Sequence, residues 1–234
     1  MSTIEDLDRR FYPGYVDEHA RFDALIRQHL RPGISVLDAG AGRGVMYPYD
    51  YKDAVARVSG VDEDPAVKQN SNLTDAEVAD LASLPYSDGE FDLIFSKYGF
   101  EHLERPLAVM RELRRVLKPG GRLLIHTPNR WHYVTILAAL TPTSFHSWFN
   151  EKRGREHDDT FRTVYRANSK RRLTELAAAS RFRVVDVQLV ETKPDYLFFH
   201  PLAYLGGIAY ERLVNRFDAL ENVRVQLLAD LEAI

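Results

Sequence analysis

The sequence contains no cysteine among its 234 residues. This absence excludes disulfide bonds, thiolate metal sites and a cysteine nucleophile, and it is consistent with a reducing compartment. Long apolar runs are also absent, since no stretch approaches the ~20 apolar residues that a membrane-spanning helix needs. The opening residues are acidic and lack the apolar core of a signal peptide. We therefore expect a cytoplasmic protein without a transmembrane segment.

The charge of the chain is nearly balanced. The formal net charge is −3 and the pI is near 6.2, so we expect no general attraction to anionic membranes and no nucleic-acid partner. Apolar residues make up 45% and charged residues 28% of the chain, the balance of an ordinary globular protein. The length suits one domain with a sizeable core and some additional segments.

Short apolar runs alternate with helical patterns along most of the chain. One helical face consists of Phe22, Leu25, Ile26, His29 and Leu30, and residues 31–33 end that helix. Further helices are expected over 103–117, with Pro106 in the first turn, and over 169–180. Strands are expected at 34–39, 56–61, 77–79, 91–95, 122–126, 182–190 and 223–229. This alternation predicts an α/β protein with a mostly parallel sheet and helices on both faces.

The same patterns divide the chain into three parts. Residues 1–33 are an N-terminal helical segment, 34–190 are the core, and 191–234 are an apolar C-terminal extension that carries the last strand. Residues 130–167 interrupt the core and are rich in aromatic, histidine and arginine side chains. Because this stretch is longer than a normal connection, we expect it to form a lid-like insertion.

Three glycines follow the first buried strand, and their spacing narrows the choice of ligand. Gly40, Gly42 and Gly44 stand where glycine permits a positive φ and lets a ligand approach the backbone closely. An ordinary tight loop is the alternative without function. A dinucleotide-binding turn would need glycine at the position of Val45, and a phosphate-binding P-loop is excluded because no Gly-Lys-Ser/Thr follows.

The second strand ends at Asp62. A carboxylate in this place can accept hydrogen bonds from both hydroxyls of a ribose. The alternative is a surface carboxylate in a turn. Asp62 alone does not distinguish one nucleotide-containing cofactor from another.

Four motifs in order resemble those of class I methyltransferases that depend on S-adenosylmethionine. They are the glycine turn at 36–44, the stretch 78–96, the Glu-His-Leu at 101–103 and the Leu-Lys-Pro-Gly-Gly-Arg-Leu at 117–123. The resemblance covers 34–129 in register and 168–190 more loosely. It is closest to the ubiquinone and menaquinone biosynthesis group, with its type 11 methyltransferase domain. One departure is Arg181, where relatives usually have glycine.

The resemblance implies a Rossmann-like sheet of seven strands whose last strand is antiparallel. It also implies S-adenosylmethionine as the cofactor and S-adenosylhomocysteine as the product. Asp38 would orient the glycine turn and the cofactor's amino group, while Asp80 and the backbone of Leu81 would bind adenine. The implied cofactor-binding residues are Asp38, Gly40, Ala41, Gly42, Gly44, Asp62, Glu63, Asp80, Leu81, Ser96, Lys97 and His102.

Methyl transfer is a displacement at an activated carbon, so the protein mainly aligns the acceptor with the cofactor. A base is needed only where the acceptor must lose a proton. Histidine titrates closest to neutral pH, and the candidates near the strand ends are His102, His126 and His132. The alternative for each is a structural hydrogen bond, and His102 is better placed to line the cofactor pocket than to act as the base.

The insertion offers side chains for an acceptor. Aromatic rings could cover an apolar acceptor and arginines could bind a carboxylate or phosphate, so the candidates are Tyr133, Trp148, Arg153, Arg155 and His157. A solvated charge cluster over a small apolar core is the alternative. Residues 157–159, His-Asp-Asp, do not predict a metal site because adjacent residues rarely bind one ion together.

The segment 196–210 is unusually apolar. It could shape an acceptor pocket, form a homodimer face or lie on a membrane surface, and packing within the chain or in a dimer is the favoured interpretation because few basic residues flank it. The sequence thus predicts methyl transfer to a small molecule, with O-methylation of a hydroxylated lipid- or sugar-linked metabolite favoured. The alternatives are C- or N-methylation, a noncatalytic protein that binds S-adenosylmethionine or its product, and an NAD-linked oxidoreductase.

Overall fold

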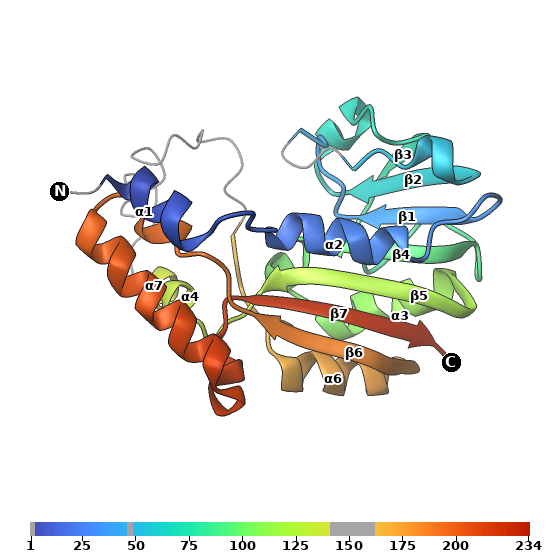
Figure 1. Cartoon of the computed structure of the whole chain (residues 1–234). Coiled ribbons are helices and arrows are strands. Elements are labelled where there is room, and N and C mark those ends of the chain that lie inside the picture. The colour runs from blue at the N-terminus through green and yellow to red at the C-terminus, as the bar shows by residue number, and fades with distance from the viewer. Residues whose placement is uncertain (1–2, 46–48, 141–161) are drawn as a thin grey trace.

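A computed structural model describes residues 3–45, 49–140 and 162–234 of the chain. Its centre is one sheet of seven strands in the order β3-β2-β1-β4-β5-β7-β6 (Figure 1). The strands are β1 Ser35–Ala39, β2 Arg57–Asp62, β3 Asp75–Val78, β4 Phe91–Lys97, β5 Leu117–Pro128, β6 Phe182–Val190 and β7 Gln226–Ala233. Neighbouring strands are parallel except that β7 is antiparallel to both β5 and β6. The predicted seven-stranded α/β fold is therefore confirmed.

The last strand lies further along the chain than the expected 223–229. Hydrophobicity alone predicts an end before Asp230 and Glu232, but the strand continues because both carboxylates have arginine partners on neighbouring strands. Arg122 of β5 pairs with Asp230 and Glu232, and Arg183 of β6 also pairs with Glu232. These ion pairs let charged residues extend a buried strand, since a buried charge needs a partner.

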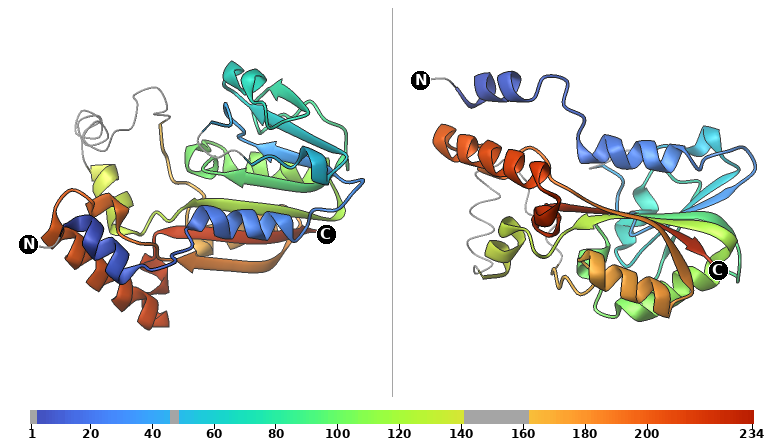
Figure 2. Two further views of the ribbon diagram at one scale, coloured as in Figure 1. Left: turned by 45° about the horizontal axis from the view of Figure 1, so that its top comes forward. Right: turned by 60° about the horizontal axis from the view of Figure 1, so that its bottom comes forward.

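Three helices cover the two faces of the sheet, as Figure 2 shows most clearly in its right-hand view. Helices α3, Pro106–Val116, and α6, Lys170–Ala179, pack on one face through a core that includes Met110, Leu113 and Leu173. Helix α2, Glu18–Arg27, packs on the other face through Phe22 and Ile26. The helix expected over 103–117 is shorter at both ends, because Pro106 lacks the N–H of an interior position and Leu117 already belongs to β5.

Three further helices gather at the edge where the parallel strands end: α1 Ile4–Phe11, α4 Tyr133–Leu140 and α7 Pro201–Arg216 (Figure 1). Helix α1 packs on α7 through Leu7, Tyr204 and Ile208, and the Tyr204 hydroxyl donates to Asp8. The apolar segment 196–210 thus packs within the chain along one side of α7, while Leu202 on another side is 66% exposed. Among the described residues, no helix combines the length and the apolar character that crossing a bilayer requires.

Short 3-10 helices complete the description. They are Lys52–Ala54, Pro65–Gln69, Phe100–His102, Asp195–Leu197 and Asp218–Val223. The turn that ends α6 contains Arg181 with φ +60°, so the position where the resembled family usually has glycine is left-handed. The side chains of 138–140 and all of 141–161 lie outside the described residues.

Candidate functional site

The glycine turn lies where the strand order reverses, between β1 and β4, at the carboxyl ends of the strands. Gly40, Gly42 and Gly44 have φ values of +85°, +48° and +71°. The N–H groups of Gly40 and Ala41 both donate to the carbonyl oxygen of Val61, at 2.8 and 3.1 Å, which fixes the turn against the end of β2. Ligands of open α/β sheets bind in this crevice.

Two asparagines hold the turn from the other side. Asn70 donates through its amide to the carbonyl oxygens of Ala41 and Gly42, both at 3.2 Å, and Asn72 donates to that of Gly44 at 3.1 Å. A Cβ added to Gly44 would lie 2.2 Å from the Asn70 Oδ1 atom. Sequence reasoning missed both asparagines, because nothing in their own neighbourhood indicates a contact with the turn.

Asp62 is already part of the turn. Its Oδ2 atom accepts from the Gly42 N–H at 3.0 Å and its Oδ1 atom accepts from the Asp64 N–H at 2.9 Å. A carboxylate has about four acceptor sites, so each oxygen keeps capacity for a ligand hydroxyl. The neighbouring Glu63, also predicted to bind the cofactor, is exposed.

Asp38 and Lys97 lie at the ends of β1 and β4, and the pKa values of both are shifted. Burial, and then the negative charge of Asp62, raise the pKa of Asp38 to about 8, while Lys97 opposes this shift. Burial lowers the pKa of Lys97 to about 7, with Glu18 the largest opposing charge. The Lys97 ammonium donates to the Tyr49 hydroxyl at 2.6 Å and lies 4.3 Å from the centre of that ring. Such shifts favour a ligand that brings its own charges.

The ends of β1 and β4 approach each other closely. The Ser96 hydroxyl donates to the Ala39 carbonyl oxygen at 2.7 Å, so this predicted pocket residue joins the two strands. A Cβ added to Gly99 would lie 2.9 Å from the Ser96 Oγ atom. Gly99 is therefore required by packing.

Asp80 and Leu81 follow β3 and lie where the resemblance implies adenine. Asp80 accepts from the Ala82 N–H at 2.8 Å and pairs with Arg105 at 2.5 Å. The N–H of Leu81 has no acceptor among the described residues, although the side chain is 8% exposed. A donor without an acceptor beside a carboxylate suits the edge of a purine.

Four polar side chains meet where β4 and β5 end and β7 begins: Lys97, Tyr98, His126 and Gln226, here named the strand-end cluster. Lys97 and His126 are register partners, and the Tyr98 N–H donates to the His126 carbonyl oxygen at 2.9 Å. The Gln226 amide donates to the Tyr98 hydroxyl at 3.3 Å. Tyr98 has φ +54°, and strained non-glycine backbone of this kind concentrates at functional sites.

His126 is fully buried, and its ring lies 4.8 Å from that of Tyr98 and 5.3 Å from that of Phe22. Burial, and then the charge of Lys97, lower the pKa of His126 well below its ordinary value, so the ring is neutral. A hydrogen-bonding contact with the Gln226 side chain opposes this shift, so these two buried side chains are partners of each other in the cluster.

The other two predicted histidines lie outside the strand-end cluster. His102 ends the 3-10 helix that follows β4, and its Nδ1 atom lies 3.1 Å from the Arg162 carbonyl oxygen. His132 is buried with its Nε2 atom 3.5 Å from Glu191, and its ring packs on Tyr133 and Tyr210. The structure therefore places only His126 of the three in the strand-end cluster.

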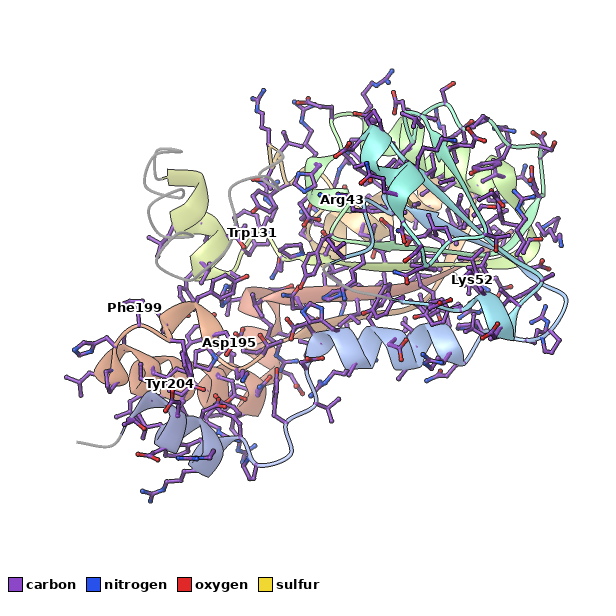
Figure 3. The ribbon with its side chains drawn as sticks, turned by 90° about the horizontal axis from the view of Figure 1, so that it is seen from above. Arg43, Lys52, Trp131, Asp195, Phe199 and Tyr204 are labelled. Carbon is purple, nitrogen blue, oxygen red and sulfur yellow. The ribbon has the colours of Figure 1, made fainter. Side chains whose placement is uncertain are left out.

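Of the predicted acceptor residues, only Tyr133 is described. It begins α4, and burial raises its pKa to about 12. Trp148, Arg153, Arg155 and His157 lie outside the described residues. Trp131 and Phe199 are 52% and 59% exposed and lie toward one end of the molecule, whereas Lys52 lies toward the other (Figure 3). Within the described ranges, no three His, Asp or Glu side chains are grouped as metal ligands.

Comparison with known proteins places this site in context. Residues 37–125 match a family model described as methyltransferase domain. The chain is 34% identical over 139 residues to a probable S-adenosylmethionine-dependent methyltransferase from Mycolicibacterium smegmatis. The matched region covers 55% of this chain and 53% of the relative. It is 35% identical over 103 residues to the 2-methyl-6-phytyl-1,4-hydroquinone methyltransferase of Synechocystis, covering 41% of this chain and 32% of that protein. The chain thus spans about half or less of these relatives.

Solved structures share the fold across nearly the whole chain. The geranyl diphosphate C-methyltransferase of Streptomyces coelicolor, in complex with Mg²⁺, geranyl diphosphate and S-adenosyl-L-homocysteine, has 17% identity and a TM-score of 0.57, with 92% of this chain and 81% of that one covered. A methyltransferase from Haloferax volcanii, solved with the Trm112 activator, has 20% identity and a TM-score of 0.57, with 98% and 92% covered.

Proposed function

We propose that this chain, whose residues 37–125 are a class I S-adenosylmethionine-dependent methyltransferase domain, transfers the methyl group of that cofactor to a small-molecule acceptor. The family and the fold are those that the sequence motifs predicted. The observation that carries the proposal is a set of groups at the switch point. They are the glycine turn, Asp38 with its raised pKa, Asp62 with remaining acceptor capacity, and the Leu81 N–H, which has no acceptor among the described residues.

These groups fit the three parts of the cofactor. The carboxyl of Asp38 would face the ammonium of the methionine end, because a nearby cation would restore the ionised form that burial disfavours. Asp62 would accept from the ribose hydroxyls with its remaining lone pairs. Asp80, which pairs with Arg105, and the Leu81 N–H would bind the adenine edge.

We assign acceptor alignment to the strand-end cluster. When bound, the cofactor supplies an activated methyl group, and the protein needs to orient the acceptor and exclude water. Lys97, with a pKa near 7, is better matched than the buried His126 to take up the proton of a hydroxyl acceptor, while the neutral His126 and Gln226 would support Lys97 and Tyr98. A cluster with these polar groups favours O-methylation over C-methylation.

An apolar tail on the acceptor is the second part of the proposal. Trp131 and Phe199 are exposed toward the end of the molecule where the parallel strands end (Figure 3), and Leu202 is exposed on α7. Two proteins that this chain resembles are described as acting on a phytyl hydroquinone and on geranyl diphosphate. We therefore favour a hydroxylated, lipid-linked acceptor over a sugar-linked one, and C- or N-methylation remains the alternative.

Calorimetry with S-adenosylhomocysteine, with NAD⁺ for comparison, tests the cofactor. We expect binding of the former alone, and Asp62→Asn should weaken it at least tenfold, while the matched variant of the exposed Asp53, Asp53→Asn, should not. No affinity for S-adenosylhomocysteine would refute the proposal. Labelled S-adenosylmethionine with a panel of hydroxylated lipids then tests catalysis, and cofactor binding without transfer to any acceptor would favour the noncatalytic alternative.

Three further hypotheses from the sequence belong to this proposal. Homodimerisation through 196–210, the absence of a nucleic-acid partner and the cytoplasmic location are each testable. Light scattering of the purified protein measures the mass of the species in solution and so tests for a dimer. The exposed side chains of α7 that could contact a second copy are Leu202, Leu205 and Leu213, each at least 38% exposed.

A further inference from the structure

A hollow of about 600 Å³ lies at the edge of the sheet opposite the glycine turn, where β4, β5 and β6 begin. Its polar lining consists of four arginines, one carboxylate and one hydroxyl: Arg111, Arg114, Arg115, Arg181, Asp88 and Ser180. An apolar wall is formed by Leu117, Pro119 and Ala179. The hollow is therefore strongly basic although the whole chain is slightly acidic.

Two of the four guanidinium groups are held in place. Arg114 donates to a backbone oxygen of Ile234, the last residue of the sequence, at 3.1 and 2.8 Å. Arg115 donates to Glu112 at 2.7 Å and to Asp88 at 2.8 Å. The single lining carboxylate is thus already paired, and it cannot neutralise the remaining arginines.

The other two guanidinium groups belong to Arg111 and Arg181. Neither has an acceptor or an ion-pair partner within 3–45, 49–140 and 162–234, the part of the chain that the structure describes. They come from different elements, since Arg111 lies on α3 and Arg181 in the turn between α6 and β6. The fold therefore brings two exposed guanidinium groups, without partners among the described residues, to one concave surface.

The backbone at Arg181 gives a second, independent indication. Its φ of +60° is a conformation that disfavours every side chain relative to glycine. The turn is fixed by hydrogen bonds from the Arg181 N–H to the Ala178 carbonyl oxygen and from the Ile234 N–H to the Arg181 carbonyl oxygen. Glycine would satisfy this turn with less strain, so the arginine side chain is not there for the turn. Strain that the fold does not need points to a function.

We propose that this hollow binds a small molecule that carries a phosphate group on an apolar body. Guanidinium groups match phosphate oxygens in charge and geometry, and two unpaired ones from different elements can bind one phosphate together. The volume lies within the range of small-molecule sites, and the apolar wall gives the body of the ligand a surface to contact. The site is separate from the methyl-transfer site, because the two lie at opposite edges of the sheet.

Calorimetry with phenyl phosphate at low ionic strength tests the site. We expect saturable binding that weakens at least tenfold in Arg181→Gly and in Arg111→Gln. Arg171→Gln is the matched control, because Arg171 is an exposed arginine of α6 outside the hollow, and its affinity should equal that of the parent. Glycine fits the left-handed backbone, so a thermal unfolding scan should show that Arg181→Gly is folded.

Two related compounds separate the parts of the proposal. Phenol should not bind, and inorganic phosphate should bind at least tenfold more weakly than phenyl phosphate. Absence of saturable binding of phenyl phosphate, equal affinity in Arg181→Gly, or equal affinity for phenol or inorganic phosphate would each overturn it. Affinity for S-adenosylhomocysteine should be unchanged in all three variants, so this test is independent of the methyl-transfer proposal.

Discussion

Replacement of Asp38 by asparagine should change how the stability of the protein depends on pH. The pKa of Asp38 is raised from 3.8 to about 8, so between about pH 4 and pH 8 the folded protein binds one more proton than the unfolded chain at this residue. The unfolding free energy of the parent should therefore fall as the pH rises through this window, and this contribution should stop falling above pH 8. Asparagine carries no proton to lose, so Asp38→Asn should lack this fall.

The size of the effect follows from the shift. One pH unit corresponds to about 1.4 kcal/mol for a single proton, and because Asp38 keeps partial contact with solvent, its contribution across the window should be a few kcal/mol, below the roughly 6 kcal/mol of the full shift. For each pH unit between 5 and 8, the unfolding free energy of Asp38→Asn should rise by up to about 1.4 kcal/mol relative to that of the parent. Asparagine nearly preserves the shape of the side chain, so packing losses should be small.

Urea denaturation of the cofactor-free protein at several pH values between 5 and 8 measures this difference. Asp53→Asn is the control, since the exposed Asp53 carboxyl should leave the pH profile as in the parent. Parallel profiles for Asp38→Asn and the parent would show that Asp38 is ionised in the folded protein, which refutes the argument. A second readout is proton release on binding S-adenosylhomocysteine, measured in two buffers of different ionisation enthalpy, which should be smaller in Asp38→Asn.

Three further changes test other features. Gly44→Ala would place a Cβ 2.2 Å from the Asn70 Oδ1 atom at a φ of +71°. The left-handed backbone alone should cost about 1–2 kcal/mol of stability, and calorimetry should show at least a tenfold loss of affinity for S-adenosylhomocysteine. Unchanged affinity would contradict this expectation. Arg181→Gly should raise the unfolding free energy in urea by about 1 kcal/mol, and a decrease would argue against backbone strain. Lys97→Met should remove the rise in unfolding free energy between about pH 8 and pH 10 that follows from the lowered pKa of Lys97; a rise of equal size in the variant counts against it.

Local patterns were sufficient to predict the sheet and the cofactor end of the site. Strand β6 has the bounds 182–190 that its apolar run predicts, and β1 with its glycine turn was found because strand, glycines and carboxylate are adjacent in the chain. The third strand was placed two residues late, at 77–79 and not Asp75–Val78, because its exposed edge position leaves a weak apolar signal.

The residues that sequence reasoning missed depend on contacts between distant segments. Asn70 holds the glycine turn across 29 residues, and Gln226 meets Tyr98 only because β7 inserts between β5 and β6. Within the predicted helical segment 1–33, the position of α1 was not given, since a short, highly charged segment shows little apolar periodicity. Its Thr3–Asp6 capping box and its packing on Tyr204 explain its presence.

The long connection between β6 and β7 leaves and re-enters the sheet at one place, because Val190 and Gln226 are paired neighbours on adjacent strands. Residues 191–225, which include α7, therefore form one connection that leaves the sheet and returns to it at adjacent positions. The entropy of closing such a loop grows only slowly with its length. A change in the length of this connection would therefore leave the register of β6 and β7 intact.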